Sequence, residues 1–239
     1  MKILLLDQGN SSLKLGWLEA GRLRFLGRAA SHAALDALLP ALPDRAWLAS
    51  VAAPETRSAL CESLQSRGIP LCEARVEAHQ ALLPTRYRPE QLGVDRWLAL
   101  LASRARGLQP CVVVDAGSAT TIDVLDAAGE HLGGYILPGA AMMEQAVLGG
   151  TAIRPAAAEG GGQGLPQGTA EAIREGALQS QVALVERVRG GLGDAAPVVL
   201  GGGAADPLAA RLASPVLRVE QLVLEGLAVL AREETACAG

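Results

Sequence analysis

The chain has 239 residues and a net charge of −4; half of its residues are hydrophobic, 19% are charged and only 3% are aromatic. This length allows one large domain or two small ones, and the composition argues against a disordered chain. The acidic balance, without a dense Lys/Arg run, disfavours nucleic acid as the main partner.

Cysteine usage and the N-terminal residues bear on the compartment. The cysteines at 61, 72, 111 and 237 form no CxxC pair, and the three histidines lie far from them in sequence. Zinc-type spacing is therefore missing, and reduced thiols in a reducing compartment are expected. The apolar run 3–6 stops at Asp7, too short for a signal-peptide core or a membrane span. We therefore expect a cytoplasmic protein without membrane association.

Two stretches of the chain repeat one pattern. Residues 3–14 read ILLLDQGNSSLK and residues 111–122 read CVVVDAGSATTI, each an apolar run followed by Asp, any residue, Gly and small polar residues. One constant offset places Asp7 on Asp115, Gly9 on Gly117 and Gly21 on Gly129. Each copy predicts strand, tight turn, strand, turn, strand. Internal duplication is the favoured interpretation, and chance is the alternative because such turns are common at strand ends.

Helix and strand patterns alternate after each copy. In the first half we expect strands over 47–51 and 69–76 and helices over 54–67 and 89–106. In the second half we expect helices over 139–148, 169–189, 206–212 and 221–232, and strands over 198–200 and 216–219. These halves predict an α/β fold of two similar domains, 1–108 and 109–239, facing each other across a cleft. The glycine-rich segment 159–168 is predicted to be a mobile loop.

The two Asp-x-Gly turns carry groups that a polyphosphate requires. A glycine turn presents main-chain N–H groups to an anion, and Asp7 and Asp115 can hold a cation that bridges phosphates. The nearby hydroxyls that can donate to phosphate oxygens are those of Ser11, Ser12, Ser118, Thr120 and Thr121. Capping of its own turn is the alternative role of each aspartate.

Two further features leave alternatives open. Lys14 can reach a phosphate as a point charge or be a solvated strand residue. The turn 201–203 can admit a nucleotide to the backbone or be a plain glycine turn. No GxxxxGK[ST] loop exists, so the chain is not a P-loop enzyme.

Five segments, in order along nearly the whole chain, resemble the motifs of type III pantothenate kinases. They are DQGNSSLK at 7–14 (family DxGNTxxK), GVDR at 93–96 (GxDR), DAGSATTID at 115–123 (DxGTAxTxD), GGYILPG at 133–139 (GGxIxPG) and the GT pair at 168–169. Ser11 and Ser118 stand where the family usually has Thr, and both keep the hydroxyl donor.

The resemblance implies a fold, an activity and partners. The fold is that of the acetate and sugar kinase/Hsp70/actin superfamily. The activity is ATP-dependent phosphorylation of pantothenate to 4'-phosphopantothenate, the first step of coenzyme A biosynthesis. Mg²⁺ would enter with ATP, K⁺ or NH₄⁺ would be the monovalent cation, and a homodimer would complete the pantothenate site across its interface. The apolar segment 139–148 fits either that interface or a core.

The resemblance also assigns roles to residues. Asp95 is the general base, in or near the first turn of a predicted helix whose dipole would keep it ionised; a plain N-cap is the alternative. ATP is assigned to Asp7, Gln8, Gly9, Asn10, Ser11, Ser12, Leu13, Lys14 and Ser118, and the monovalent cation to Asp115. Pantothenate is assigned to Tyr87, Gly93, Val94, Asp95, Arg96 and Thr169.

The substrate residues have structural alternatives. Arg96 matches a carboxylate bidentately, but it can also be a surface arginine. Tyr87 can be a half-buried core tyrosine, and Thr169 can be a helix N-cap.

Two other functions compete with this one. Another superfamily enzyme, such as a sugar or acetate kinase or a polyphosphatase, would share both phosphate loops but would not need GVDR followed by GGYILPG. A transcriptional accessory factor on the same fold usually carries an added DNA-binding arm, whereas this acidic chain starts directly with the first predicted strand.

Overall fold

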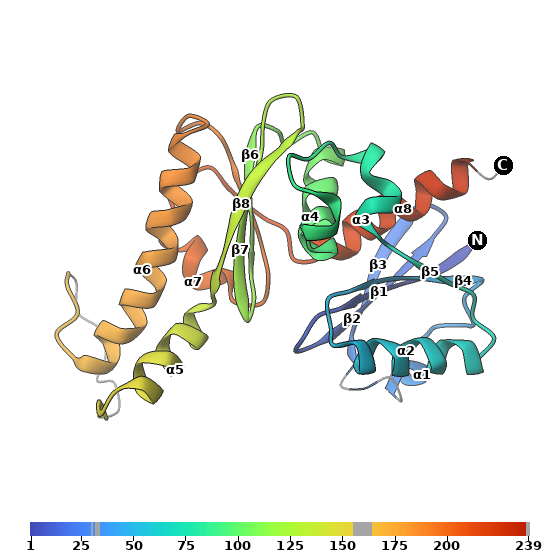
Figure 1. The fold of residues 1–239 in the computed structure, drawn as a ribbon, viewed down its shortest axis with the longest axis horizontal. Coiled ribbons are helices and arrows are strands. Elements are labelled where there is room, and N and C mark those ends of the chain that lie inside the picture. Colours follow the sequence, from blue (N-terminus) through green and yellow to red (C-terminus); the bar gives the residue numbers. More distant parts are fainter. Residues whose placement is uncertain (30, 32–33, 155–163, 238–239) are drawn as a thin grey trace. The chain divides into compact units, whose positions relative to one another are not determined.

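A computed structural model describes residues 1–29, 31, 34–154 and 164–237 of the chain (Figure 1). It forms two compact units: unit 1 comprises Met1–Leu108, Gly129–His131 and Gln221–Gly239, and unit 2 comprises Gln109–Ala128 and Leu132–Glu220. The division differs from the expected second domain 109–239. The last helix belongs to unit 1 because its apolar side chains pack there, and so does the short segment 129–131.

Unit 1 is built on one five-stranded sheet in the order β3-β2-β1-β4-β5. Its strands are β1 (Lys2–Gln8), β2 (Leu13–Glu19), β3 (Arg22–Ala29), β4 (Arg45–Ser50) and β5 (Leu71–Glu73). β1 runs antiparallel to β2 and parallel to β4. The helices are α1 (Leu35–Leu38), α2 (Pro54–Ser66), α3 (Val76–His79), α4 (Val94–Ala105) and α8 (Leu222–Cys237), with 3-10 turns at Gln80–Leu82 and Pro89–Gln91.

Helices cover both faces of the sheet in unit 1. Leu4 and Leu6 of β1 share one buried cluster with Leu60 and Leu64 of α2. On the other side α8 packs against β1, β2 and β4, and α4 lies alongside α8 (Figure 1). A central strand buried on both faces explains why residues 3–6 are an unbroken apolar run rather than an alternating one.

Unit 2 repeats the arrangement of unit 1. Its strands are β6 (Cys111–Ala116), β7 (Ala119–Leu125), β8 (His131–Pro138), β9 (Val198–Gly201) and β10 (Val216–Arg218), in the order β10-β9-β6-β7-β8. β6 occupies the position of β1, with an antiparallel neighbour on one side and a parallel one on the other. The predicted α/β fold of two similar domains is confirmed, and the matching strand order supports duplication.

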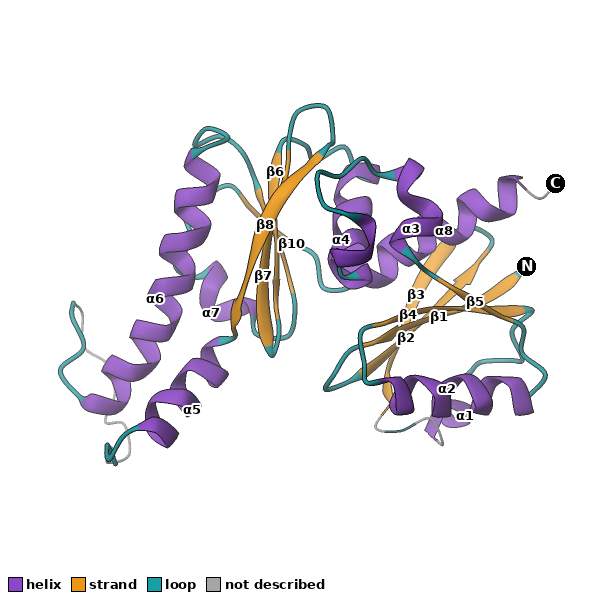
Figure 2. Ribbon diagram, in the orientation of Figure 1, coloured by secondary structure: helices purple, strands orange, loops and turns teal. Residues whose placement is uncertain are grey.

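The helices of unit 2 are α5 (Ala140–Gly150), α6 (Thr169–Gly190) and α7 (Ala205–Ala209) (Figure 2). Val182 and Val185 of α6 and Leu208 of α7 share a core cluster with Val112 and Val114 of β6. In contrast, α5 contains no buried residue although its sequence is mostly apolar. Among the described residues, the structure contains no helix with the length and apolar character to cross a bilayer.

Some predicted elements differ from the observed ones. The predicted strand 69–76 is reduced to β5, because the chain enters α3 at Val76. The predicted helix 89–106 begins as a 3-10 turn and is interrupted, because Leu92 and Gly93 are extended before α4 starts. The predicted mobile loop 159–168 lies partly outside the described residues, since 159–163 are among those not described.

Gly226 allows α8 to approach α4 closely. A Cβ atom at this position would collide with the carbonyl group of Leu98, which is main chain and cannot move aside by a rotamer change. We expect Gly226→Ala to lower the free energy of unfolding by about 1–3 kcal/mol, the usual cost of overpacking, and to lower Tm. Thermal unfolding followed by circular dichroism measures this change.

Gly176→Ala is the matched control. Gly176 lies exposed in α6, and a Cβ there would meet nothing within 4 Å. Alanine replaces glycine in a helix interior with a gain of about 0.5–1 kcal/mol, so this variant should keep or raise Tm. Equal melting temperatures for Gly226→Ala and wild type would contradict the close contact between α4 and α8.

Candidate functional site

The first Asp-x-Gly turn joins β1 to β2 in unit 1. The main-chain N–H of Gly9 donates to the carbonyl oxygen of Ser12 at 3.0 Å and closes the turn. Asp7 and Lys14 are cross-strand partners, and Lys14 Nζ lies 3.0 Å from Asp7 Oδ2. Asp7 is buried and Lys14 is half-buried. Lys14 is therefore not a solvated strand residue: it balances the charge of Asp7 beside the turn.

The side chain of Gln8 is bonded within the protein. Its Nε2 donates to the carbonyl oxygen of Thr56 at 3.1 Å, and its Oε1 accepts from Ser50 Oγ at 2.8 Å. Gln8 is only 4% exposed. These bonds tie the end of β1 to the end of β4 and the start of α2. If Gln8 contacts ATP, it therefore does so through its main-chain atoms and not through its side chain.

Asp95 is the second residue of α4. The helix N-cap is Gly93, so the alternative that Asp95 is merely a cap is wrong. Its Oδ1 accepts the main-chain N–H of Arg96 at 2.8 Å. Burial raises the pKa of Asp95, and the charge of Asp7 raises it further. The hydrogen bond and charge of Arg96 act in the opposite direction but are outweighed, so the expected effect of the helix N-terminus does not dominate.

Arg96 lies against Tyr87. Arg96 is 6% exposed, so it is not a surface arginine, and its Cζ lies 5.2 Å from the centroid of the Tyr87 ring. A guanidinium over an aromatic face is a favourable contact that also fixes the plane of its donors. The Tyr87 ring in turn stacks on His131, with centroids 5.3 Å apart and an interplanar angle of 21°. His131 was not predicted, because it belongs to no motif and its partners are distant in sequence.

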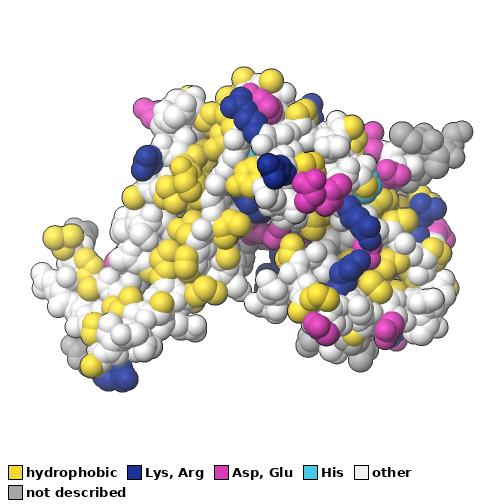
Figure 3. All heavy atoms as spheres, viewed as in Figure 1, with side chains coloured by type: hydrophobic (Ala, Val, Ile, Leu, Met, Phe, Trp, Pro, Cys, Tyr) yellow, Lys and Arg dark blue, Asp and Glu magenta, His cyan; other side chains and the backbone are white. Residues whose placement is uncertain are grey.

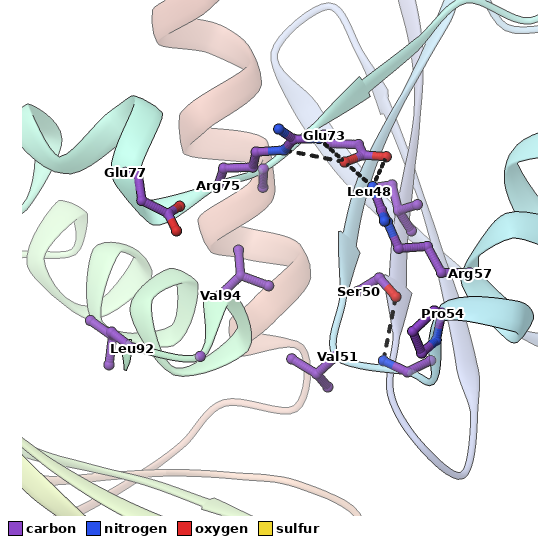
Figure 4. Close-up of a pocket in the computed structure, with 13 residues that line it drawn as sticks. Leu48, Ser50, Val51, Pro54, Arg57, Glu73, Arg75, Glu77, Leu92 and Val94 are labelled. Carbon is purple, nitrogen blue, oxygen red and sulfur yellow. Dashed lines mark hydrogen bonds and ion pairs between the residues drawn. The ribbon is translucent and has the colours of Figure 1, made fainter. Parts of the chain in front are cut away.

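A pocket of about 550 Å³ adjoins the start of α4 in unit 1 (Figure 4). Arg57 and Arg75 converge there on Glu73, with Arg57 Nη2 at 2.6 Å from Oε1 and Arg75 Nη2 at 2.9 Å from Oε2. Burial alone would raise the pKa of Glu73, but the hydrogen bonds from the two arginines lower it overall. The pocket is lined by Leu48, Ser50, Val51, Ala52, Pro54, Arg57, Glu73, Ala74, Arg75, Glu77, Leu92, Gly93 and Val94.

This pocket connects two predicted groups of residues. Gly93 and Val94, predicted to bind substrate, are part of its lining. Ser50, also in the lining, is the residue that bonds to Gln8 of the first phosphate turn. The volume lies within the usual range of small-molecule sites.

The second Asp-x-Gly turn joins β6 to β7 in unit 2. The N–H of Gly117 donates to the carbonyl oxygen of Ala119 at 3.0 Å, and Ser118 is exposed at the tip. The N–H of Gly139 donates to the carbonyl oxygen of Ser118 at 2.9 Å. A Cβ at residue 139 would collide with the carbonyl of Gly117. The segment GGYILPG therefore ends directly against the second phosphate turn.

Asp115 differs from Asp7 in its surroundings. Its cross-strand partner is Thr121, where Asp7 has Lys14. The glycine turn after β9 also lies beside it, since a Cβ on Gly202 would be 2.5 Å from Asp115 Oδ1. Asp115 and the turn 201–203 thus lie next to each other in unit 2. Across the described ranges, no group of three or more His, Cys, Asp or Glu could hold a metal ion, so a cation at Asp115 needs main-chain or ligand oxygens as well.

Two threonines of unit 2 differ from the expectations. Thr120 is 1% exposed and its hydroxyl donates to Gln181 Oε1 at 2.8 Å, so it is a core group and not a phosphate donor. Thr169 is exposed and is the first residue of α6, whose N-cap is Gly168. The N-cap alternative for Thr169 is therefore wrong.

Comparison with known proteins agrees with this arrangement. The sequence profile of the family described as type III pantothenate kinase matches residues 3–190. A type III pantothenate kinase of Aromatoleum aromaticum is 40% identical, over 98% of this chain and 99% of that protein.

Two solved structures share the fold. One is a conserved Baf-family protein of Campylobacter jejuni, described as a candidate transcriptional activator, with TM-score 0.66 and 24% identity over 98% of this chain and 99% of that one. The other is an archaeal actin homolog, with TM-score 0.51 and 14% identity over 98% of this chain and all of that one. At these identities the likeness establishes an actin-like fold alone. Because the family profile covers most of the sequence and the curated relative matches over its full length, the chain belongs to the type III pantothenate kinase family.

Proposed function

We propose that the chain transfers the γ-phosphoryl group of ATP to the primary hydroxyl of pantothenate, the first step of coenzyme A biosynthesis. The observation that carries this proposal is the start of α4, where the GVDR segment places a half-buried carboxylate of raised pKa next to a buried arginine. Family membership supplies the reaction, and the geometry supplies roles for the residues.

Asp95 accepts the proton of the attacking hydroxyl. A base with a raised pKa accepts a proton more readily than an ordinary aspartate does. The phosphoryl transition state is loose, so orienting the hydroxyl matters more than activating it strongly. Arg96 holds the carboxylate of pantothenate, and Tyr87 supports the guanidinium. Gly93 and Val94 present the pocket wall, and Thr169 is the remaining substrate contact.

ATP occupies the two phosphate turns. Asp7, Gly9, Asn10, Ser11, Ser12, Leu13, Lys14 and the main chain of Gln8 form the first, and Ser118 the second. Lys14 is held in place next to the turn by its ion pair with Asp7. A kinase of this family uses ATP with a divalent metal ion, and Asp7 is the carboxylate of the first turn that suits Mg²⁺.

Asp115 binds the monovalent cation, K⁺ or NH₄⁺. Its cross-strand neighbour is Thr121 and the glycine turn after β9 lies beside its carboxylate, so hydroxyl and main-chain oxygens are available there as further cation ligands. Asp115→Ala is expected to raise the KM for ATP and to abolish the stimulation of activity by K⁺ or NH₄⁺. The measurement is initial rate against salt, with Na⁺ as the reference. Asp206→Ala, which breaks an exposed ion pair with Arg218 in the same unit, is the control. An unchanged salt response in Asp115→Ala would place the cation elsewhere.

The chain forms a homodimer through α5 and β8, and Thr169 serves a site completed by the second copy. Met142 and Val147 of α5 are 47% and 37% exposed, and Tyr135 and Ile136 of β8 are 50% and 63% exposed. Hydrophobic side chains gather over this part of unit 2 in Figure 3. Exposed apolar surface of this kind usually marks an interface. Sedimentation equilibrium is expected to give the mass of two chains.

A coupled ADP-release assay tests the function. With Mg-ATP and K⁺ the protein should turn over pantothenate but not glucose or acetate. Equal turnover of a sugar would favour another kinase of the superfamily. A complete lack of ATP turnover with all three substrates would favour a regulator on this fold. The cytoplasmic location stays a prediction.

A further inference from the structure

His131 is joined to the loop before α4 through its main chain. It opens β8, but it belongs with the segment 129–131 to unit 1. Its N–H donates to the carbonyl oxygen of Pro84 at 2.9 Å, and its carbonyl oxygen accepts the N–H of Arg86 at 3.1 Å. These two bonds form an isolated parallel bridge between Thr85 and His131. An ion pair between Arg86 and Glu130 flanks it at 3.3 Å.

The side chain of His131 reaches the same loop at two points. Its Nδ1 lies 2.9 Å from Thr85 Oγ1, and that hydroxyl also accepts the main-chain N–H of Tyr87 at 3.1 Å. The hydroxyl of Thr85 therefore joins the ring of His131 to the main chain of Tyr87. The imidazole ring stacks on the Tyr87 ring. His131 is 0% exposed, so it cannot touch the substrate from this position.

We infer that His131 is a positioning residue for substrate binding: with Thr85 it fixes the ring of Tyr87, and Tyr87 fixes the guanidinium of Arg96. This inference rests on the proposed function of Arg96 as the carboxylate clamp. Arg96 needs a fixed plane to make two parallel bonds to a carboxylate. Tyr87 can fix that plane only if its own ring is fixed. The hydroxyl of Thr85, which is bonded to His131, accepts the main-chain N–H of Tyr87, and the ring of His131 stacks on the ring of Tyr87.

Two substitutions of His131 separate its stacking on Tyr87 from its hydrogen bond to Thr85. His131→Phe keeps a ring that can stack on Tyr87 but loses the hydrogen bond to Thr85. His131→Asn keeps an amide group that can bond to Thr85 but loses the ring. Thr85→Val removes the shared hydroxyl while His131 stays intact. His79 provides the control: it is a histidine of unit 1 whose ring lies 5.9 Å from that of Trp47 and 6.4 Å from that of Trp97, rather than on Tyr87.

The kinetic readout is specific for positioning. We expect His131→Asn to raise the KM for pantothenate about two- to tenfold, the range of one aromatic contact, with little change in kcat or in the KM for ATP. His131→Phe and Thr85→Val should show smaller increases. Each should also reduce the discrimination between pantothenate and its uncharged carboxamide analogue, because that discrimination depends on the orientation of Arg96. His79→Asn should leave the KM for pantothenate and the discrimination against the carboxamide at their wild-type values.

A double-mutant cycle with Tyr87→Leu completes the test. Without the Tyr87 ring, His131→Asn should have no additional effect on the pantothenate KM. An unchanged pantothenate KM and unchanged discrimination in all three variants, with an active wild type, would overturn the inference. Equal increases in both Michaelis constants would overturn it too, because they would indicate general damage. If His131→Asn does not fold, His131→Phe and Thr85→Val decide. An inactive wild type contradicts the proposed function instead.

Discussion

Asp95→Asn is expected to lower kcat for pantothenate phosphorylation by about 10²–10⁴-fold while the fold stays intact. The amide has the size of the carboxylate and can still accept the N–H of Arg96 through its oxygen, so the start of α4 should not change. It cannot accept the proton of the hydroxyl, and this loss acts on the chemical step. Single-turnover measurements at saturating ATP would separate that step from binding. A near-normal kcat would mean that Asp95 is not the base.

Asp44→Asn is the matched control for this substitution. Asp44 is another carboxylate of unit 1 that accepts a main-chain N–H, from Lys2 at 2.6 Å. The same chemical change at that position removes charge and leaves the site untouched, so kcat should stay within about twofold of wild type, as for most surface substitutions. A large loss there would show that removal of any such carboxylate damages the enzyme.

The raised pKa of Asp95 predicts two pH effects. Activity should decline on the acid side with a midpoint above the usual range of an aspartate, because protonated Asp95 cannot act as a base. The folded state holds the proton more tightly than the unfolded state, so stability falls as pH rises from the unfolded pKa through the raised folded pKa. Asparagine does not ionise, so Asp95→Asn does not lose stability in this pH window. Above that window Asp95→Asn should therefore melt at the same temperature as wild type or higher.

Arg96→Lys is expected to lower kcat/KM for pantothenate about ten- to a hundredfold, the cost of one charge-assisted hydrogen bond of roughly 1.5–3 kcal/mol. Lysine keeps the charge but offers a rotating point donor in place of a planar fork, and it loses part of the contact with Tyr87. The carboxylate would be held loosely, and the hydroxyl would drift from the γ-phosphate. The KM for ATP should stay near wild type.

An amide analogue of pantothenate and a second arginine control this result. Wild type should discriminate against the uncharged analogue, and Arg96→Lys should do so much less. Arg211→Lys replaces an arginine of unit 2 that makes a two-pronged pair with Glu175, and its kinetics should match wild type. If Arg96→Lys raised the ATP KM and left pantothenate unaffected, Arg96 would belong to the nucleotide site.

The sequence predicts the repeated parts of the molecule well because they depend on local patterns. The two Asp-x-Gly turns follow buried strands, and their equal spacing to the next turn predicts the shared strand order. The body of α4 is also predictable, since its apolar residues recur at helical spacing, whereas its start is predicted at residue 89 and lies at Val94. These features need no information about distant partners.

The remaining parts depend on contacts between residues far apart in sequence. His131 is missed because its partners Thr85 and Tyr87 precede it by more than forty positions and no motif links them. The roles of Gln8 and Thr120 are missed because a motif position does not indicate whether its side chain faces the ligand, and both of these side chains bond inside the core. The burial of Arg96 is likewise a tertiary property.

The return of α8 to unit 1 has a consequence for synthesis on the ribosome. Unit 1 begins with β1, yet the helix that covers one face of its sheet is translated only after all of unit 2. Nascent chains usually fold domain by domain from the N-terminus. Here the face of β1 that awaits α8 must stay uncovered, or be shielded by a chaperone, while all of unit 2 is translated. The sheet of unit 1 is thus covered on both faces only after α8 has been made, and truncated products lacking residues 222–237 would expose apolar surface and become substrates for quality control.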